Sequence, residues 1–381
     1  MRDPPFPAVC ALALVLLLLA LPTHMRARNS GTLLYIGWSF FATLFIFVNS
    51  LVWSGNISDP APVWCDISAK IAIAWSVGLP AASLCINRRL YQITHPKYAY
   101  SDGNTKRRTV IFDLSIGLGL PVLVMILHIV VRGHRYNIIE DIGCYPTTYM
   151  TLAAVPLVYM WPILIGFVSL FYSFFTIGEL VHRRRQFSTT LSAAHSGLNA
   201  SQYFRLMALA ATDLLFSLPM SLFVLITNLK NIQIPWISWA DTHQNFWTVK
   251  FMTWQYVEFF PPFMTLLQIF RWSPPAMAIV FFIYFGVAGE ATADYCRWFW
   301  AVAGWFGIKQ KIGPGHNPNW SNRLASNPSA SRKVSIPSAR PTNSLDRALN
   351  YDVESQLQSR DSLGFGNNPD DQEASKPSKL K

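Results

Sequence analysis

Residues 65–89 read CDISAKIAIAWSVGLPAASLCINRR and show the pattern that decides the fold. Residues 65–87 are predominantly apolar and match the ~20 residues that a helix needs to cross the core of a bilayer. The pair Arg88-Arg89 follows directly. Because basic residues are retained on the cytoplasmic side of a membrane, this stretch predicts a membrane-spanning helix that ends in the cytoplasm.

Six further apolar segments of similar length predict six more spans. They cover residues 6–23, 31–54, 110–131, 152–178, 206–229 and 263–288. The last segment is long enough only if it includes the run 262–273, so we expect Arg271 to lie within the membrane. The fold class predicted is therefore an all-α membrane protein, a bundle of seven transmembrane helices.

The connectors between these segments alternate in basic charge, which predicts the orientation of the bundle. Twelve basic residues fall on one side, namely Arg26, Arg28, Arg88, Arg89, Lys97, Lys106, Arg107, Arg108, Arg183, Arg184, Arg185 and Arg205. Five fall on the other, namely Arg2, Arg132, Arg135, Lys230 and Lys250. The positive-inside rule places the N-terminus outside and the C-terminus inside, which is the plan of a G-protein-coupled receptor.

The composition agrees with a membrane protein and argues against other classes. Of the 381 residues, 51% are hydrophobic and 13% are charged, whereas soluble domains contain about 25% charged residues. The net charge of +11 is explained by the cytoplasmic connectors, so we expect no nucleic-acid partner. The first segment is followed, not preceded, by its basic cluster, so we interpret it as an uncleaved span and not a signal peptide.

The chain is expected to have three parts. Residues 1–289 form the seven-helix bundle. Residues 290–309 carry aromatic residues at helical spacing, which favours an amphipathic helix on the inner membrane surface over an irregular linker. Residues 310–381 are rich in Ser, Pro, Asn and Gly, which predicts a disordered cytoplasmic tail.

Three cysteines and one serine are candidates for covalent modification. Cys65 and Cys144 both face the oxidising side of the predicted topology, so they are candidates for a disulfide that fixes the second outer loop over a ligand pocket. Cys296 is a juxtamembrane candidate for palmitoylation. Ser335 follows Arg332-Lys333-Val334 and is a candidate for phosphorylation.

Charged residues inside spans are costly and usually mark a function or a buried pair. Asp66, Lys70 and Arg271 lie toward the outer end, where they are candidates for ligand binding. The alternative is structural pairing of Lys70 with Asp66 and of Arg271 with Glu258 or a carbonyl. Asp213, in the middle of the sixth span, is either a conformational switch or a helix–helix hydrogen-bonding residue.

Aromatic residues are dense between residues 234 and 260. Trp247, Trp254 and the nearby Glu258 are candidates for ligand contact, although an aromatic belt at the membrane surface explains part of this density. We expect the ligand between the outer ends of the third, fifth, sixth and seventh helices.

The inner ends carry the candidates for G-protein contact. These are Arg88, Arg89, Arg183, Arg184, Arg185 and Arg205. The positive-inside rule alone would also explain them. The sequence contains no nucleophile motif and no His/Cys cluster with metal-ligand spacing, so we predict no enzymatic activity, no cofactor and no metal.

Several segments resemble fungal mating-pheromone receptors of the a-factor-receptor type, the class D G-protein-coupled receptors. The segments are Trp64-Cys65-Asp66-Ile67, Gly78-Leu79-Pro80-Ala81, Leu84-Cys85-Ile86-Asn87-Arg88-Arg89-Leu90-Tyr91, Glu140-Asp141-Ile142-Gly143-Cys144, Tyr203-Phe204-Arg205-Leu206-Met207, Arg271-Trp272, Phe281-Phe282-Ile283-Tyr284-Phe285-Gly286 and Glu290-Ala291. They occur in order over about residues 6–297, and the tail lies outside the resemblance.

The resemblance implies a multi-pass receptor of the plasma membrane whose ligand is a prenylated, methyl-esterified peptide pheromone. Binding would activate a heterotrimeric G protein and a MAP-kinase mating response. Membrane lipid is a further partner, and a homodimer is left open. The alternative function is a multi-span transporter of a hydrophobic or peptide substrate, which substrate flux would distinguish from signalling.

Overall fold

The structure is a computed structural model that describes residues 4–95, 103–182, 200–230 and 235–286. The chain divides into two units, Met1–Gln310 and Lys311–Lys381. All described residues belong to the first unit. The predicted juxtamembrane helix 290–309, the tail 310–381, Arg183, Arg184, Arg185, Cys296 and Ser335 lie outside the described residues.

Seven helices in the described part of the chain are long and apolar enough to cross a membrane, which confirms the predicted fold class. The first three are α1 (Pro5–Arg26), α2 (Ser30–Val52) and α3 (Pro62–Thr94). The fourth span consists of α4 (Gly103–Leu114), the π-helical turn η2 (Ser115–Gly119) and α5 (Leu120–Val130). The fifth consists of the π-helical turn η3 (Val155–Tyr159) and α6 (Met160–His182). The last two are α8 (Ala200–Lys230) and α11 (Pro261–Phe285).

The seventh span extends upstream as expected. Helix α11 begins at Pro261 and includes Arg271, whose side chain is only 2% exposed. The paired prolines Pro274 and Pro275 lie inside this helix, where neighbouring helices can satisfy the carbonyls that proline leaves without a donor.

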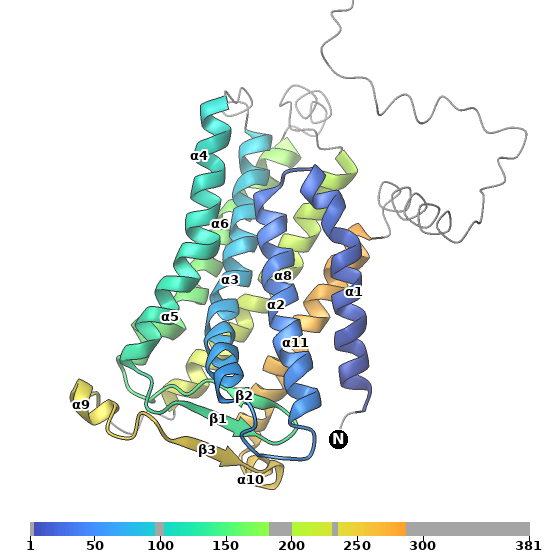
Figure 1. Cartoon of the computed structure of the whole chain (residues 1–381). Helices are drawn as coiled ribbons and strands as arrows, with labels where there is room; N and C mark the ends of the chain where they lie inside the picture. The colour runs from blue at the N-terminus through green and yellow to red at the C-terminus, as the bar shows by residue number, and fades with distance from the viewer. Residues whose placement is uncertain (1–3, 96–102, 183–199, 231–234, 287–381) are drawn as a thin grey trace, which may run out of the picture. The chain divides into compact units, whose positions relative to one another are not determined.

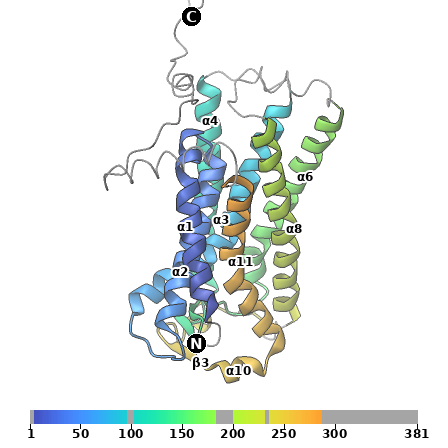
Figure 2. The ribbon, with the colours of Figure 1, turned by 90° about the vertical axis from the view of Figure 1, so that its right-hand side faces the viewer.

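Helix α3 is the central helix of the bundle and packs against α2, α5, α6 and α8 (Figures 1 and 2). Close packing with α2 depends on Gly78, because a Cβ atom there would lie 2.4 Å from the Trp38 ring. The Trp38 indole donates a hydrogen bond of 2.8 Å to the carbonyl of Gly117 in the π-helical turn η2. This hydrogen bond joins α2 to the fourth span at its π-helical turn.

A small three-stranded sheet crosses one end of the bundle, a feature that the all-α prediction did not include (Figure 1). Its strands are β1 (Tyr136–Ile139), β2 (Gly143–Tyr145) and β3 (Val249–Met252). Strand β1 pairs antiparallel with β2 and parallel with β3, with Ile138 opposite Cys144 and Phe251. We call this the sheet end. It also carries the short helices α9 (Trp239–Thr242) and α10 (Trp254–Glu258).

Candidate ligand cavity and its cap

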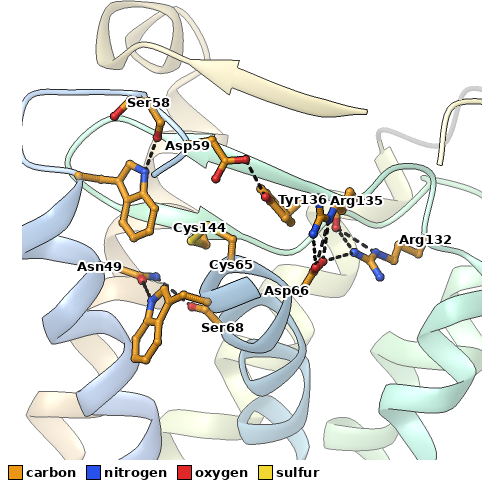
Figure 3. The surroundings of a disulfide bond; sticks show 12 residues. Asn49, Ser58, Asp59, Cys65, Asp66, Ser68, Arg132, Arg135, Tyr136 and Cys144 are labelled. Atoms are coloured by element: carbon orange, nitrogen blue, oxygen red, sulfur yellow. Dashed lines mark hydrogen bonds and ion pairs between the residues drawn. A yellow bond between two sulfur atoms is a disulfide. The ribbon is translucent and has the colours of Figure 1, made fainter. Parts of the chain in front are cut away.

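The predicted disulfide between Cys65 and Cys144 is present, with the two Cα atoms 5.1 Å apart (Figure 3). Cys65 lies in the first turn of α3 and Cys144 in β2. The bond therefore holds the sheet against the end of the central helix.

Buried side chains and hydrogen bonds surround this disulfide. The Trp53 ring is fully buried against it, and its indole donates a 2.8 Å hydrogen bond to the carbonyl of Ser58. Asp141 has a positive φ of 62° in the β1–β2 turn, and its carboxylate accepts a 2.9 Å hydrogen bond from the Gly55 amide. The following Gly143 has φ of 84°, a conformation that favours glycine. The connector between α2 and α3 is thus tied to the sheet.

Asp66 forms ion pairs with two arginines of the connector that precedes β1 (Figure 3). Its carboxylate oxygens lie 3.2 Å from Arg132 Nη2 and 2.6 Å from Arg135 Nη2. These hydrogen bonds raise the pKa of the Arg135 guanidinium. Next to them, Tyr136 donates a 2.8 Å hydrogen bond to Asp59. Burial raises the pKa of the Tyr136 phenol, so this residue remains a donor.

The ion pair of Lys70 with Asp66, which was the structural alternative to ligand binding, is not formed in the described structure. The Lys70 ammonium lies 3.4 Å from the Met125 carbonyl and 3.4 Å from His128 Nδ1, both on the fourth span. This alternative was wrong because the arginines of the connector, 66 and 69 residues away in the sequence, bind the carboxylate instead. An i, i+4 spacing shows which residues share a helix face and cannot show a competing partner.

The Arg271 side chain extends from α11 toward α1. Its guanidinium carbon is 3.9 Å from the centre of the Phe6 ring, which is a cation–π contact. Phe6 also packs edge-to-face on Trp272 at 4.8 Å. Arg271 lines a small cavity of about 10 Å³ with Asn49 and Ser68, just large enough for a water molecule.

The aromatic candidates near α10 have different environments. Trp254 is buried, and its indole donates a 3.0 Å hydrogen bond to Glu258. The Trp254 amide donates a 2.8 Å hydrogen bond to Glu140 at the end of β1. Trp247, by contrast, is 77% exposed. Trp254 and Glu258 therefore join the sheet to the start of α11, whereas Trp247 lies on the surface.

A cavity of about 270 Å³ extends into the bundle from the sheet end. Its described lining residues are Ala72, Ile73, Trp75, Ser76, Leu79 and Pro80 of α3; Tyr145, Pro146, Thr148 and Met150 around the end of β2; Val158, Tyr159 and Pro162 of the fifth span; Asp213, Phe216, Ser217, Met220, Ser221, Val224 and Asn228 of α8; and Phe263, Leu266, Ile269, Phe270, Ser273 and Met277 of α11. It thus lies between the third, fifth, sixth and seventh helices.

None of the six residues predicted to bind a ligand is among the described residues that line this cavity. The six are Asp66, Lys70, Trp247, Trp254, Glu258 and Arg271. They do not converge on one site. Asp66, Trp247, Trp254 and Glu258 lie at the sheet end, which we also call the cap, Lys70 contacts the fourth span, and Arg271 contacts α1. Sequence reasoning weighted charged and exposed aromatic residues, whereas the cavity is formed by ordinary apolar residues whose helical faces meet only in the folded bundle.

The cavity is deep and nearly uncharged. Along α8 it extends from Asn228 to Asp213, which corresponds to ~22 Å at 1.5 Å per residue. Asp213 is the only acidic or basic side chain among the described lining residues, and it is 1% exposed. Such a site can hold an extended apolar group, with polar contacts from a few hydroxyls and one carboxyl group.

The opposite end of the bundle contains a second ion pair. Asp113 of α4 is 1% exposed and lies 3.3 Å from Arg88 near the end of α3 that is remote from the sheet. Asp113 also accepts a hydrogen bond from Ser30 of α2, and the Arg88 guanidinium stacks 4.0 Å from the Phe112 ring. Sequence reasoning missed Asp113, although it lies inside the predicted span 110–131 and the cost of a charge in a membrane would have revealed it.

Two further arginines predicted to contact the G protein, Arg89 and Arg205, also lie in the described part of the chain. Arg89 donates hydrogen bonds of 3.3 Å to the Arg28 carbonyl and to Asn29 Oδ1. Arg205 is partly buried near the start of α8. Arg88 and Arg89 therefore both join α3 to its neighbours.

The chain is similar to known fungal pheromone receptors over most of its length. Residues 5–307 match the family described as STE3, Pheromone A receptor. It is 40% identical to the Pheromone B alpha 2 receptor of Schizophyllum commune over 81% of this chain and 47% of that protein. It is 33% identical to Pheromone receptor 1 of Ustilago hordei over 77% of this chain and 82% of that protein.

A more distant relative gives the same result, with 26% identity to the Pheromone M-factor receptor of Schizosaccharomyces pombe over 80% of this chain. The chain spans about half the length of the Schizophyllum commune relatives that it matches. The family match covers the seven spans and the disulfide. This multi-pass membrane protein therefore belongs to the STE3 pheromone A receptor family.

Proposed function

We propose that this protein is a plasma-membrane receptor for a prenylated peptide pheromone. In this proposal, ligand binding activates a heterotrimeric G protein and a MAP-kinase mating response. The observation that carries the proposal is the deep apolar cavity under the disulfide-bonded cap, in a chain of a pheromone receptor family.

The chemistry of the cavity supports a ligand with an apolar chain. Its walls consist mainly of aliphatic and aromatic side chains over ~22 Å. Tyr145 packs edge-to-face on Phe263 and Phe270 where the cap meets α11. A prenyl chain would lie along these walls, and the peptide portion would contact the sheet end.

The orientation predicted from charge agrees with this arrangement. With the N-terminus outside, the sheet end faces the oxidising side, where a disulfide is stable. A secreted ligand would reach the cavity from that side. The basic end, with Arg88, Arg89 and Arg205, would face the G protein inside the cell.

A functional assay tests ligand class and coupling together. We would express the chain in yeast cells that lack their own pheromone receptors and carry a G-protein-dependent reporter. Farnesylated, methyl-esterified peptides would be compared with the same peptides without the lipid. A response to prenylated peptides alone supports the proposal. Equal responses to both forms would contradict a prenyl ligand, and substrate flux without a reporter response would support the transporter alternative.

A matched pair of substitutions tests the cavity as the ligand site. Met220→Trp fills the cavity from α8, whereas Leu215→Trp adds the same volume on the exposed face of that helix. We expect Met220→Trp to raise the half-maximal ligand concentration by about tenfold or more, which corresponds to ~1.4 kcal/mol. The L215W receptor should respond like the unchanged protein at equal surface expression. Equal effects of the two substitutions would place the ligand elsewhere.

The coupling site is tested by Arg88→Gln together with Arg89→Gln. Because Arg88 also pairs with Asp113, the receptors are compared at equal surface expression. We expect the double variant to lose most of its reporter response while ligand binding to intact cells is retained. A full response would indicate that these arginines serve only membrane topology and helix packing.

A further inference from the structure

Asp213 stands apart from the other residues of the cavity. It lies at the deep end, near the middle of α8, and its side chain is almost completely buried. No basic side chain of the described residues forms an ion pair with it. Because an ionised carboxylate in an apolar interior is very costly without a positive charge, this position calls for a compensating partner.

Two buried hydroxyl groups from other helices accompany Asp213. Tyr35 of α2 and Ser83 of α3 direct their hydroxyls toward its carboxyl group. Both residues are at least 98% buried, and neither hydroxyl has a hydrogen-bond partner among the described residues other than this carboxyl group. Neither residue lines the cavity. The cluster formed by Asp213, Tyr35 and Ser83 therefore extends behind the cavity wall, between α2, α3 and α8.

The same face of α2 carries further polar groups of this kind. Ser39 and Thr43 follow Tyr35 at intervals of four residues, so all three lie on one side of the helix. Both are buried, and neither hydroxyl has a hydrogen-bond partner in the described residues. Buried polar atoms are normally satisfied by protein, ordered water or an ion. The hydroxyls of Ser39 and Thr43 therefore continue, along α2, the buried polar face that begins at Tyr35.

We propose that Asp213, with the hydroxyls of Ser83 and Tyr35, binds a small monovalent cation, for which we take Na⁺. Oxygen donors of this type suit a hard cation. One carboxylate neutralises a single positive charge, whereas a divalent ion would leave net charge buried in the membrane. A cationic group of a peptide ligand would have to pass behind the cavity wall to reach the two hydroxyls, which favours a free ion.

The proposed ion would connect three helices directly beneath the ligand cavity. The adjacent residue, Thr212, is within 2.9 Å of the Tyr284 hydroxyl on α11, so this turn of α8 already contacts a fourth helix. A bound cation would therefore stabilise the packing of α8 against α2 and α3 in the state described here. This inference concerns the receptor without ligand and does not depend on the nature of the pheromone.

Thermal unfolding of the purified full-length receptor in lipid nanodiscs, without ligand, tests the site. The apparent Tm would be measured in NaCl and in the same concentration of N-methyl-D-glucamine chloride. We expect Na⁺ to raise the Tm by about 2–4 °C in a saturable manner. Asp213→Asn should remove this difference. Ser83→Ala and Tyr35→Phe should each reduce the Na⁺-dependent difference in Tm. If the D213N protein does not fold, these two variants test the proposed site.

Ser221→Ala is the matched control, because this serine lines the cavity on the same helix, two turns from Asp213, and belongs to no such group. It should retain the full Na⁺ effect. Equal Tm values of the unchanged receptor in the two salts would overturn the proposal and identify Asp213 as a neutral, protonated acid. A Na⁺ effect that persists in the D213N, S83A and Y35F proteins would overturn it too, by placing the ion elsewhere.

Discussion

The two ends of the bundle hold their carboxylates in opposite ways. At the sheet end, Asp66 is 36% exposed and pairs with Arg132 and Arg135. At the opposite end, Asp113 is 1% exposed and pairs with Arg88. At the sheet end, the disulfide and the sheet hold the structure together beside the ion pairs of Asp66. At the opposite end, Asp113 of α4 itself makes the contacts with Ser30 of α2 and Arg88 of α3.

This difference indicates which end is fixed and which end can rearrange. Removing one link at the sheet end leaves several others in place. Removing Asp113 leaves an arginine without its partner and removes the contacts that Asp113 makes with α2 and α3. We therefore expect the sheet end to serve as a rigid frame. We expect the described part of the opposite end to be more sensitive to the loss of one buried pair, because breaking a pair there is far more costly than at an exposed site.

The disulfide should produce the largest effect. We expect Cys65→Ser or Cys144→Ser to lower stability by about 3–5 kcal/mol, since the bond closes a long loop. The double substitution should cost little more than either single one, because each removes the same bond. Surface expression and thermal unfolding would measure this. Additive losses would mean that the two cysteines contribute independently and that the frame does not depend on their bond.

The buried pair should come next. We expect Asp113→Asn to lower stability by about 3 kcal/mol, because Arg88 loses its charged partner in a buried site. Basal reporter activity, normalised to surface expression, should rise because the contacts of Asp113 with α2 and α3 are weakened at this end of the bundle. Unchanged thermal stability and basal activity would show that the opposite end does not rely on this pair.

The two more exposed ion pairs of Asp66 should matter less and provide the matched comparison. We expect Asp66→Asn to cost at most about 1 kcal/mol, because solvent screens its two ion pairs and the disulfide remains. Thermal unfolding of the D66N and D113N proteins, measured side by side, would compare the two losses of stability. A larger loss for D66N would reverse the comparison between the two ends.

The smallest effect should come from His134 in the cap. Burial lowers the pKa of His134 below its ordinary value of 6.5, and nearby Lys250 and Arg132 lower it further. Its ring lies 2.7 Å from Asn137 Oδ1. As the pH falls below 6.5, the unfolded state takes up this proton before the folded state does, so the stabilising contribution present above that pH is lost.

Hydrogen exchange of the β1 amides would detect this change. Protection of β1 should decrease between neutral and mildly acidic pH in the unchanged protein. His134→Gln should flatten that dependence, because the glutamine does not titrate. An identical pH profile in the H134Q protein would assign the effect to another group.

The sequence predicts the seven spans well because each is decided locally, by an apolar run of sufficient length between charged connectors. The extension of α11 through Arg271 followed from length alone. The Cys65–Cys144 bond was predictable because the topology leaves these two cysteines on the same side. Most segments that carry the family resemblance also lie within the spans, whereas Glu140–Cys144 lies in the connector that forms β1 and β2.

Features that depend on pairing across the fold were not predictable in this way. Strand β1 has four residues and pairs with β3 from a different connector, so no local periodicity reveals it. The arginine partners of Asp66 lie in a loop whose path is fixed by the disulfide and the sheet. The cavity is lined by helical faces whose residues are typical of any apolar core, so only their mutual placement distinguishes them.

The parallel pairing of β1 with β3 has a consequence for the order of biosynthesis. The disulfide can close once the chain has been made through Cys144, but β1 has no parallel partner until synthesis reaches Met252. The fifth and sixth spans, η3 with α6 and α8, lie between these two points. The chain must therefore leave this face through the fifth span and return to it through the sixth before the sheet can be completed, so the finished sheet requires the insertion of both spans.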